Sequence, residues 1–199
     1  MLPAAESPVA YSSKQHQIAM GAAAGALAGF AASWAMNLLM GGVAAIAGRP
    51  PGDDPQQSKF QIARAVSDWQ EQADPTGEAA DQVVRKVGGR GLTQRQRDIA
   101  RPVVHYAFGS AAGAAYGALA ETFPKITIGK GIPFALSLWI LGDEVANPLL
   151  GLTPPPNKIP LTAHAAQFVA HLVYGSVLES TRTLIRRRQS VTFVLEDAA

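Results

Sequence analysis

The chain has 199 residues, of which 48% are hydrophobic and 16% are charged, and its formal net charge is +2. The charged fraction is well below the roughly 25% of a typical soluble domain, and the apolar fraction excludes a disordered tail. The chain has no cysteine, which excludes a disulfide scaffold, thiolate catalysis and cysteine-ligated metal sites. The small net charge gives no reason to expect a nucleic-acid partner.

The first apolar run, residues 17–47, contains no Lys, Arg, Asp or Glu. About 20 apolar residues are enough for a helix to cross a hydrocarbon core ~30 Å thick. The run lacks the polar stripe of a soluble amphipathic helix, and it is about twice as long as the apolar core of a signal peptide. We therefore expect a retained membrane span.

The next segment, residues 48–101, is polar, and we expect a long, partly helical loop there. Helical periodicity is present in residues 57–72 and 77–87. Trp69 either anchors the first of these pieces at the headgroup level of a bilayer or belongs to a solvated helical hairpin. Thr93 is a candidate N-cap for a helix that leads into the following apolar run.

Three further apolar runs cover residues 102–121, 130–150 and 161–181. The run over residues 130–150 is the weakest candidate span, because Asp143 and Glu144 lie in its second half. A soluble Ala-rich helical bundle is the competing interpretation, but it predicts a polar stripe on each helix. We expect an all-α, integral membrane four-helix bundle that forms one domain over residues 1–199, with the lipid bilayer as its main partner.

Glycines recur at steps of four in the first and second runs. This spacing lets helix backbones approach closely in lipid, where little hydrophobic force joins helices. The two rows predict tight packing, either of the two helices on each other or of one copy of the chain on another. Their members are Gly21, Gly25 and Gly29 in the first run and Gly109, Gly113 and Gly117 in the second.

Polar side chains gather in the half of the predicted bundle nearest the long loop. Ionisable groups within a span are costly and usually face the bundle interior or a water-filled cavity. We expect a cluster contributed by all four helices, with the members Asn37, His105, Asp143, Glu144, Asn147, His164, Gln167 and His171. Of the two adjacent acids, we expect Glu144 to face the interior towards His105 or His171.

Three roles for this cluster remain open: a hydrogen-bonded network that orients the helices, a cavity that handles protons or a solute, and a haem or metal site. Only His105 and His164 share the depth that paired haem ligands need, and the spacing matches no known metal-ligand signature. We expect no cofactor and no metal. Motifs of hydrolytic catalysis are absent from the sequence, and we expect a protein that is not an enzyme.

Several short motifs in the second half resemble one family. They are Val104-His105-Tyr106-Ala107-Phe108-Gly109, Tyr116-Gly117-Ala118-Leu119-Ala120-Glu121, Gly142-Asp143-Glu144, Pro148-Leu149-Leu150-Gly151-Leu152-Thr153-Pro154-Pro155 and Ala170-His171-Leu172-Val173-Tyr174-Gly175. Over about residues 100–188, the chain resembles the YagU-like family of bacterial inner-membrane proteins. The resemblance implies several helical spans, an inner-membrane location and a loose link with acid resistance, with no established ligand.

Three functions follow as hypotheses. The first is a contribution to acid tolerance through the His and acid cluster, because histidine titrates near neutral pH. The second is a small transporter or channel that acts as a homo-oligomer, and the third is a haem- or metal-binding membrane subunit. The basic cluster Arg186–Arg188 at the end of the last span favours cytoplasmic termini.

Overall fold

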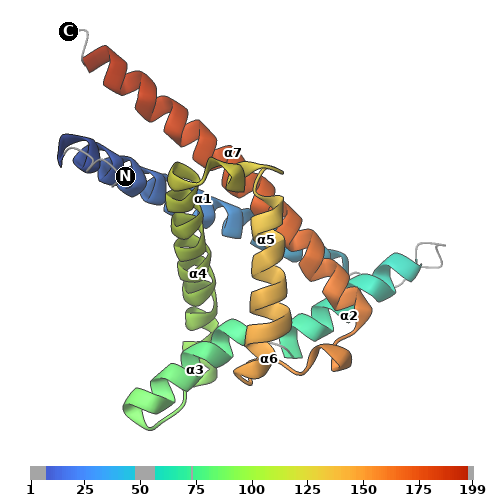
Figure 1. Ribbon diagram of the computed structural model, residues 1–199. Helices are drawn as coiled ribbons and strands as arrows, with labels where there is room; N and C mark the ends of the chain where they lie inside the picture. Colours follow the sequence, from blue (N-terminus) through green and yellow to red (C-terminus); the bar gives the residue numbers. More distant parts are fainter. Residues whose placement is uncertain (1–7, 48–56, 73, 197–199) are drawn as a thin grey trace, which may run out of the picture.

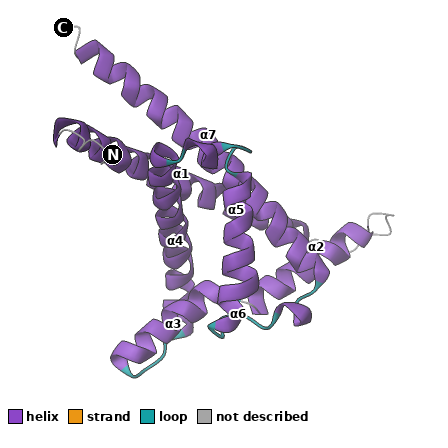
Figure 2. Ribbon diagram, viewed as in Figure 1, coloured by secondary structure: helices purple, strands orange, loops and turns teal. Residues whose placement is uncertain are grey.

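The computed structural model describes residues 8–47, 57–72 and 74–196, with side chains placed within 13–45, 61–69 and 74–189. Among these residues every regular element is a helix (Figure 2), so the all-α expectation is confirmed. The first nine residues of the predicted loop, 48–56, lie outside the described residues. The elements are α1 (Pro8–Ala47), α2 (Gln57–Gln72), α3 (Pro75–Gly88), α4 (Gln94–Thr122), η1 (Pro124–Thr127), α5 (Ile132–Leu138), η2 (Trp139–Ala146), α6 (Asn147–Leu149), η3 (Pro156–Lys158) and α7 (Leu161–Glu196).

The four predicted spans fall in α1, in α4, in the run from α5 to α6, and in α7. Within the described ranges, length and composition single out one helix that is apolar enough to cross a membrane, Ser13–Ala45 of α1. A buried core helix of a soluble protein meets the same criterion, so the four-span bundle stays a prediction. The last helix also runs past the predicted end of its span, to Glu196.

Figure 1 shows α4 and α5 side by side, with α1 and α7 crossing them obliquely. The beginning of α1 and the end of α7 extend from one end of this bundle, where the turn between α4 and α5 also lies. The α2 and α3 helices lie across the opposite end, close to α6. The long loop of the sequence analysis is therefore largely helical, and it covers one end of the bundle.

Four of the eight buried residues of the core are alanines, which allow short distances between helix axes. Two tyrosines and a leucine supply most of its volume, and the hydroxyl of Tyr174 donates a 2.7 Å hydrogen bond to the carbonyl oxygen of Gly109. This bond satisfies a buried polar group and joins α7 to α4. The buried members of the core are Ala28, Ala32, Met36, Tyr116, Ala135, Ala170, Tyr174 and Leu178.

The glycine rows of α1 and α4 lie against each other inside one chain. A Cβ atom added at Gly25 would come within 3.0 Å of the backbone of Gly113. Real Cβ atoms do not approach backbone atoms so closely, so the contact between α1 and α4 requires glycine. The facing pairs are Gly21 with Gly117, Gly25 with Gly113, and Gly29 with Gly109.

The start of α4 confirms the predicted cap. The Thr93 hydroxyl accepts a hydrogen bond from the backbone N–H of Gln96, and the Gln96 side chain accepts one from the backbone N–H of Thr93. This reciprocal capping box satisfies two backbone donors that a helix start leaves open. The helix then continues through Pro102 to Thr122 without a second start.

Ion pairs hold α3 against the first turns of α4. Asp74 caps α3 by accepting a 2.9 Å hydrogen bond from Gly77 N–H, and its other oxygen pairs with Arg101. Asp81 is 1% exposed and pairs with Arg85 and with Arg97, the latter at 3.0 Å. Each buried carboxylate of the α3–α4 hairpin therefore has a guanidinium partner, which offsets the cost of its burial.

The hydrogen bond from Arg85 holds the pKa of Asp81 below its ordinary value, although burial acts in the opposite direction. The backbone N–H of Leu92 and the charge of Arg97 lower this pKa further. A carboxyl whose pKa is lower in the folded state stabilises the fold above its unfolded-state pKa. That stabilisation is lost as the pH falls through the folded-state value.

We predict that Gly25→Ala destabilises the protein, whereas Gly41→Ala does not. The added methyl at Gly25 meets the α4 backbone, and forcing atoms into a closely packed contact costs about 1–3 kcal/mol. Nothing lies within 4 Å of a Cβ at Gly41, where alanine adds helix propensity of at most about 1 kcal/mol. Thermal unfolding in detergent measures both variants, and equal midpoints would contradict the close packing.

We predict that the protection of α3 from hydrogen exchange is constant from neutral pH down to the ordinary aspartate pKa of 3.8 and declines below it. Asp81→Asn should lower this protection already at neutral pH, because the amide cannot pair with Arg85 and Arg97 as a charge. Asp98→Asn, a change at an exposed position of α4, is the matched control. Full protection of α3 in Asp81→Asn would show that the ion pairs do not hold the hairpin.

Candidate functional site

The two adjacent acids of the third run lie on a π-helical segment. Residues Trp139–Ala146 form this π-helix between α5 and α6, and it carries Asp143 and Glu144. Such segments are rare, and they occur often at functional sites because the wider turn redirects side chains. The π-helix points the two carboxylates at different partners.

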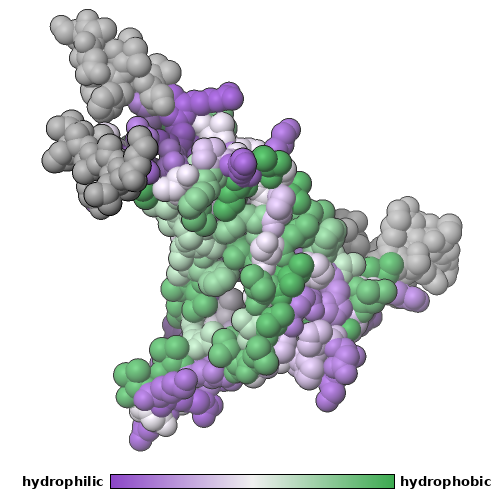
Figure 3. Space-filling model, in the orientation of Figure 1, coloured by the Kyte–Doolittle hydropathy of each residue, from purple (hydrophilic) through white to green (hydrophobic). Residues whose placement is uncertain are grey.

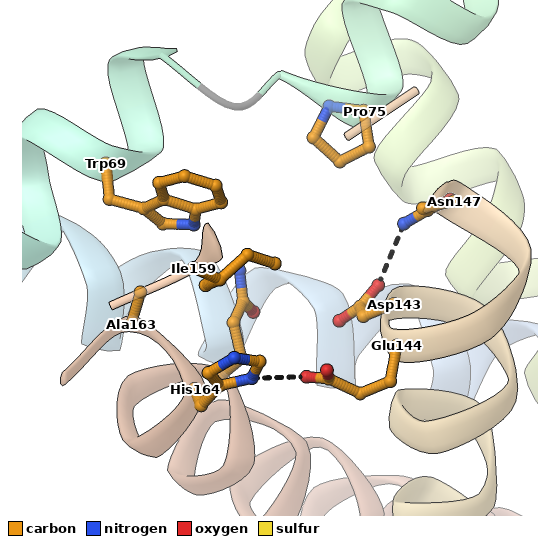
Figure 4. A pocket seen from close by; sticks show the side chains of 9 residues that line it. Trp69, Pro75, Asp143, Glu144, Asn147, Ile159, Ala163 and His164 are labelled. Atoms are coloured by element: carbon orange, nitrogen blue, oxygen red, sulfur yellow. Dashed lines mark hydrogen bonds and ion pairs between the residues drawn. The ribbon is translucent and has the colours of Figure 1, made fainter. Parts of the chain in front are cut away.

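Glu144 pairs with His164 at the start of α7 (Figure 4). The Nδ1 atom of His164 lies 2.7 Å from Oε1 of Glu144, and its Nε2 atom lies 3.1 Å from the carbonyl oxygen of Pro156. Both side chains of the pair are 20% exposed. The ring is therefore held between two oxygen acceptors, one from η2 and one from the start of η3.

The contacts of His164 bear on which atoms of the pair carry a proton. A carbonyl oxygen only accepts hydrogen bonds, so Nε2 must carry a proton towards Pro156. The 2.7 Å contact between Nδ1 and Glu144 needs a second proton, on the ring or on the carboxyl group. Without it, a nitrogen lone pair would face a carboxylate oxygen. The observed arrangement thus fits a His164–Glu144 pair that holds two protons.

Asp143 is the carboxylate that faces His171. It accepts a 3.1 Å hydrogen bond from the Asn147 side chain, and its Oδ2 lies 3.8 Å from Nε2 of His171. The Nδ1 atom of His171 lies 2.9 Å from the backbone oxygen of Gln167, so Nδ1 donates in this contact. The expectation that Glu144 faces His105 or His171 is therefore wrong: Asp143 faces His171, and Glu144 faces His164.

The contributions of the other two helices differ from the expectation. His105 on α4 lies within electrostatic range of His171, and its Nε2 is 3.4 Å from the backbone oxygen of Ser33 on α1. Asn37 instead donates a 3.1 Å hydrogen bond to the Tyr106 hydroxyl at an exposed position. The structure thus joins α1 to the polar cluster through a backbone carbonyl, and it does not place Asn37 with the acids.

A pocket opens beside the two acids and extends to the helices of the long loop (Figure 4). Trp69 of α2 and Pro75 of α3 form one wall of it, opposite Asp143 and Glu144. Trp69 had two interpretations in the sequence, and neither placed it at this pocket. Helical periodicity relates only residues within one helix, so it could not relate Trp69 to acids more than 70 positions later in the chain. The lining residues are Trp69, Pro75, Asp143, Glu144, Asn147, Ile159, Ala163, His164 and Gln167.

The arrangement bears on the haem and metal alternatives. Both ring nitrogens of His164 already face oxygen acceptors, so neither is directed at a haem iron shared with His105. Within the described part of the chain, no group of three or more His, Asp or Glu side chains is placed to hold a metal ion.

A second polar group, which the sequence analysis did not identify as a unit, lies at the opposite end of the bundle. Arg186 of α7 pairs with Glu121 of α4 at 2.9 Å, and Arg182 pairs with Glu179 at 2.7 Å and with Glu121 at 3.6 Å. These side chains are at most 22% exposed. The network joins the end of α4 to α7. The i,i+3 spacing of Glu179 and Arg182 was its only sequence signal.

Comparisons with known proteins bear on the segment that contains the polar site. Residues 90–180 match the family described as "Protein of unknown function (DUF1440)". The chain is 30% identical over 86 residues to a protein named "Inner membrane protein YagU" from Escherichia coli (strain K12). The resemblance to the YagU-like family is confirmed. The YagU-like match covers 43% of this chain and 42% of the relative, so less than half of either is compared. No solved structure matches.

The segment that matches the family of unknown function, residues 90–180, contains the whole pairing of acids and histidines. His105, Asp143, Glu144, His164 and His171 all lie between residues 90 and 180. The α1, α2 and α3 helices lie outside it, together with Asn37 and Trp69. The polar site is therefore a feature of the matched segment. To this site α1 adds the backbone carbonyl of Ser33, and α2 adds the side chain of Trp69.

We predict that Glu144→Ala destabilises the protein and that Glu144→Gln restores much of the loss. Alanine leaves Nδ1 of His164 without a partner in a partly buried site, at a cost of about 1–3 kcal/mol. Glutamine supplies an amide N–H that the neutral ring can accept. Thermal unfolding in detergent tests this order, with Asp68→Ala on an exposed position of α2 as the control. Equal midpoints for Glu144→Ala and Asp68→Ala would show that the pair is not a structural contact.

Proposed function

We propose that the protein is a multi-pass protein of the bacterial inner membrane, without enzymatic activity, that contributes to acid tolerance by binding protons at the His164–Glu144 and His171–Asp143 pairs. The name of the YagU relative supports the location, and the apolar helix α1 is long enough to cross the membrane. The remaining helices α4, α5–α6 and α7 are assigned as the other spans in this proposal.

The observation that carries the proposal is the position of His164 between two acceptors. Its contacts to Glu144 and Pro156 are both satisfied only while the pair holds two protons. Loss of a proton breaks one contact and leaves a charged group poorly solvated beside the pocket. The local structure is thereby coupled to pH through a side chain type that titrates in the range of acid stress.

The second pair, His171 and Asp143, increases the number of protons that the site can bind. Asp143 and His171 are separated by 3.8 Å, and His105 lies within electrostatic range of His171. A proton on His171 gains an attraction to Asp143 and meets a repulsion if His105 is also charged. The groups that face the two histidines of α7 are therefore Asp143 and Glu144 from η2, His105 from α4, and the backbone oxygen of Gln167 from α7 itself.

In the proposed orientation both termini are cytoplasmic, as the basic cluster Arg186–Arg188 favours. The polar site, α2 and α3 then lie at the periplasmic end, where external acid arrives first. The transporter alternative depends on contacts between copies. The two glycine rows pack α1 on α4 within one chain, so in this arrangement they offer no surface to a second copy.

We predict that replacing His105, His164 and His171 together by glutamine abolishes the contribution of the protein to survival at low pH. Cells that lack the protein are complemented with the native chain, with the triple variant or with His16→Gln, a change at an exposed position of α1. His16→Gln should behave as the native chain does.

The amount of each variant in the membrane fraction is measured by immunoblot, so that survival is compared at equal abundance. Glu144→Gln provides a second variant that should retain the fold while changing the acid response. Native survival in the triple variant, at native abundance, would refute the proposed role.

A further inference from the structure

The α3 helix presents an apolar face to the outside of the molecule. Val83 is 61% exposed and Val87 is 87% exposed, and residues four apart share a face of a helix. Gly77 and Asp81 are buried on the side that contacts α4. The two valines are therefore exposed, on a different face of α3 from the buried Gly77 and Asp81.

The direction of this face is fixed. A rotation of α3 that buried the valines would expose Asp81 and break its bonds to Arg97 and to the backbone N–H of Leu92. It would also separate Asp74 from Arg101. The ion pairs of the α3–α4 hairpin thus keep the apolar face exposed, and α3 cannot rotate to bury it in the core without breaking them.

The tip of the hairpin carries positive charge that has no acidic partner. Asp74, Glu78 and Asp81 are all paired with arginines. The exposed Lys86, Arg90 and Arg95 make no ion pair within the described residues. Lys86 lies in the last turn of α3, Arg90 in the glycine turn that follows, and Arg95 in the first turn of α4.

The position of α3 matches the surface of a bilayer. It lies across the end of α4, transverse to the helices of the bundle (Figure 1). Figure 3 shows hydrophobic surface on the side of this hairpin nearest the bundle and hydrophilic surface on the opposite side. A helix with one apolar face and basic flanks lies in the interfacial layer of a membrane, and its cations attract anionic lipids.

We propose that α3 is an interfacial helix whose valines enter the acyl boundary of the bilayer and whose basic tip binds the phosphates of anionic phospholipids. The proposal rests on the membrane location given under the proposed function. In this position the hairpin anchors the end of the bundle at a fixed depth. It thereby holds Pro75, at the start of α3, over the pocket that contains Asp143 and Glu144.

The absence of cysteine from the chain allows a direct test with single spin labels. Val87→Cys and Lys86→Cys are each labelled with a nitroxide in the full chain and reconstituted into vesicles of phosphatidylcholine with phosphatidylglycerol. We expect the label at position 87 to collide more with oxygen than with a water-soluble nickel chelate. The label at position 86 should show the reverse order.

A second arm tests the headgroup contact. The labelled Val87→Cys chain is reconstituted separately into phosphatidylcholine vesicles and into vesicles that also contain phosphatidylglycerol. The label should lie deeper in the vesicles that contain phosphatidylglycerol. Adding Lys86→Gln, Arg90→Gln and Arg95→Gln should remove this shift. The buried ion pairs of the hairpin are unchanged in this variant, so its fold is preserved.

Each contrary result has a distinct meaning. Equal access of the nickel chelate to positions 86 and 87 would refute the interfacial helix and leave a solvated hairpin. Spin–spin broadening at position 87 in dilute vesicles would also refute it, because a second copy would then cover the valines. Release of the chain from native membranes by sodium carbonate would refute the membrane location itself, and with it the proposed function.

Discussion

The backbone contact between α1 and α4 is the constraint on which the other contacts depend. Because glycine faces glycine, the two helices approach more closely than side chains would allow. The carbonyl oxygen of Gly109 then lies within reach of Tyr174, which joins α7 to the pair. The same proximity brings the Ser33 carbonyl to His105. A change that separated α1 from α4 would therefore alter the core and the polar site together.

The bundle is polar at both ends, but the two ends have different chemistry. At one end, guanidinium groups pair with Glu121 and Glu179, and arginine stays charged at any physiological pH. At the other end, the acids pair with histidines, Glu144 with His164 and Asp143 with His171. The first end is a permanent connection between α4 and α7. The second joins η2 to α7 through histidine side chains, and the proposed acid response is assigned to that end for this reason.

The hairpin of α3 and α4 lies at the end of the bundle that contains the acids and histidines. Its carboxylates are satisfied by arginines within the hairpin, which leaves valines and three further cations on the outside. A bilayer supplies the matching partners, an apolar boundary and anionic phosphates. The segment that matches the family begins at residue 90, in the turn between α3 and α4, and contains both pairs of acid and histidine. The proposals for the site and for α3 thus describe adjacent parts of one end of the molecule.

The sequence alone determined the features that depend on local patterns. Helical periodicity predicted the bounds of α2 (Gln57–Gln72), Thr93 marked the start of α4, and the uncharged runs marked the four long helical regions. It also selected most residues of the polar cluster, because an ionisable group in an apolar run is conspicuous in any sequence. The glycine spacing predicted close packing but left open which surfaces would meet.

Only the tertiary structure decided which groups face each other. The sequence did not reveal the π-helix, because this conformation depends on how the segment packs. Only the structure shows that Asp143 faces His171 and that Glu144 faces His164. Asn37 shares the depth of the cluster but faces Tyr106, because the rotation of α1 is set by its glycine contact with α4. Trp69 reaches the pocket through the arrangement of α2 against α7. Periodicity fixes the face of a helix on which a residue lies, whereas the partner of that face depends on contacts between residues distant in the chain.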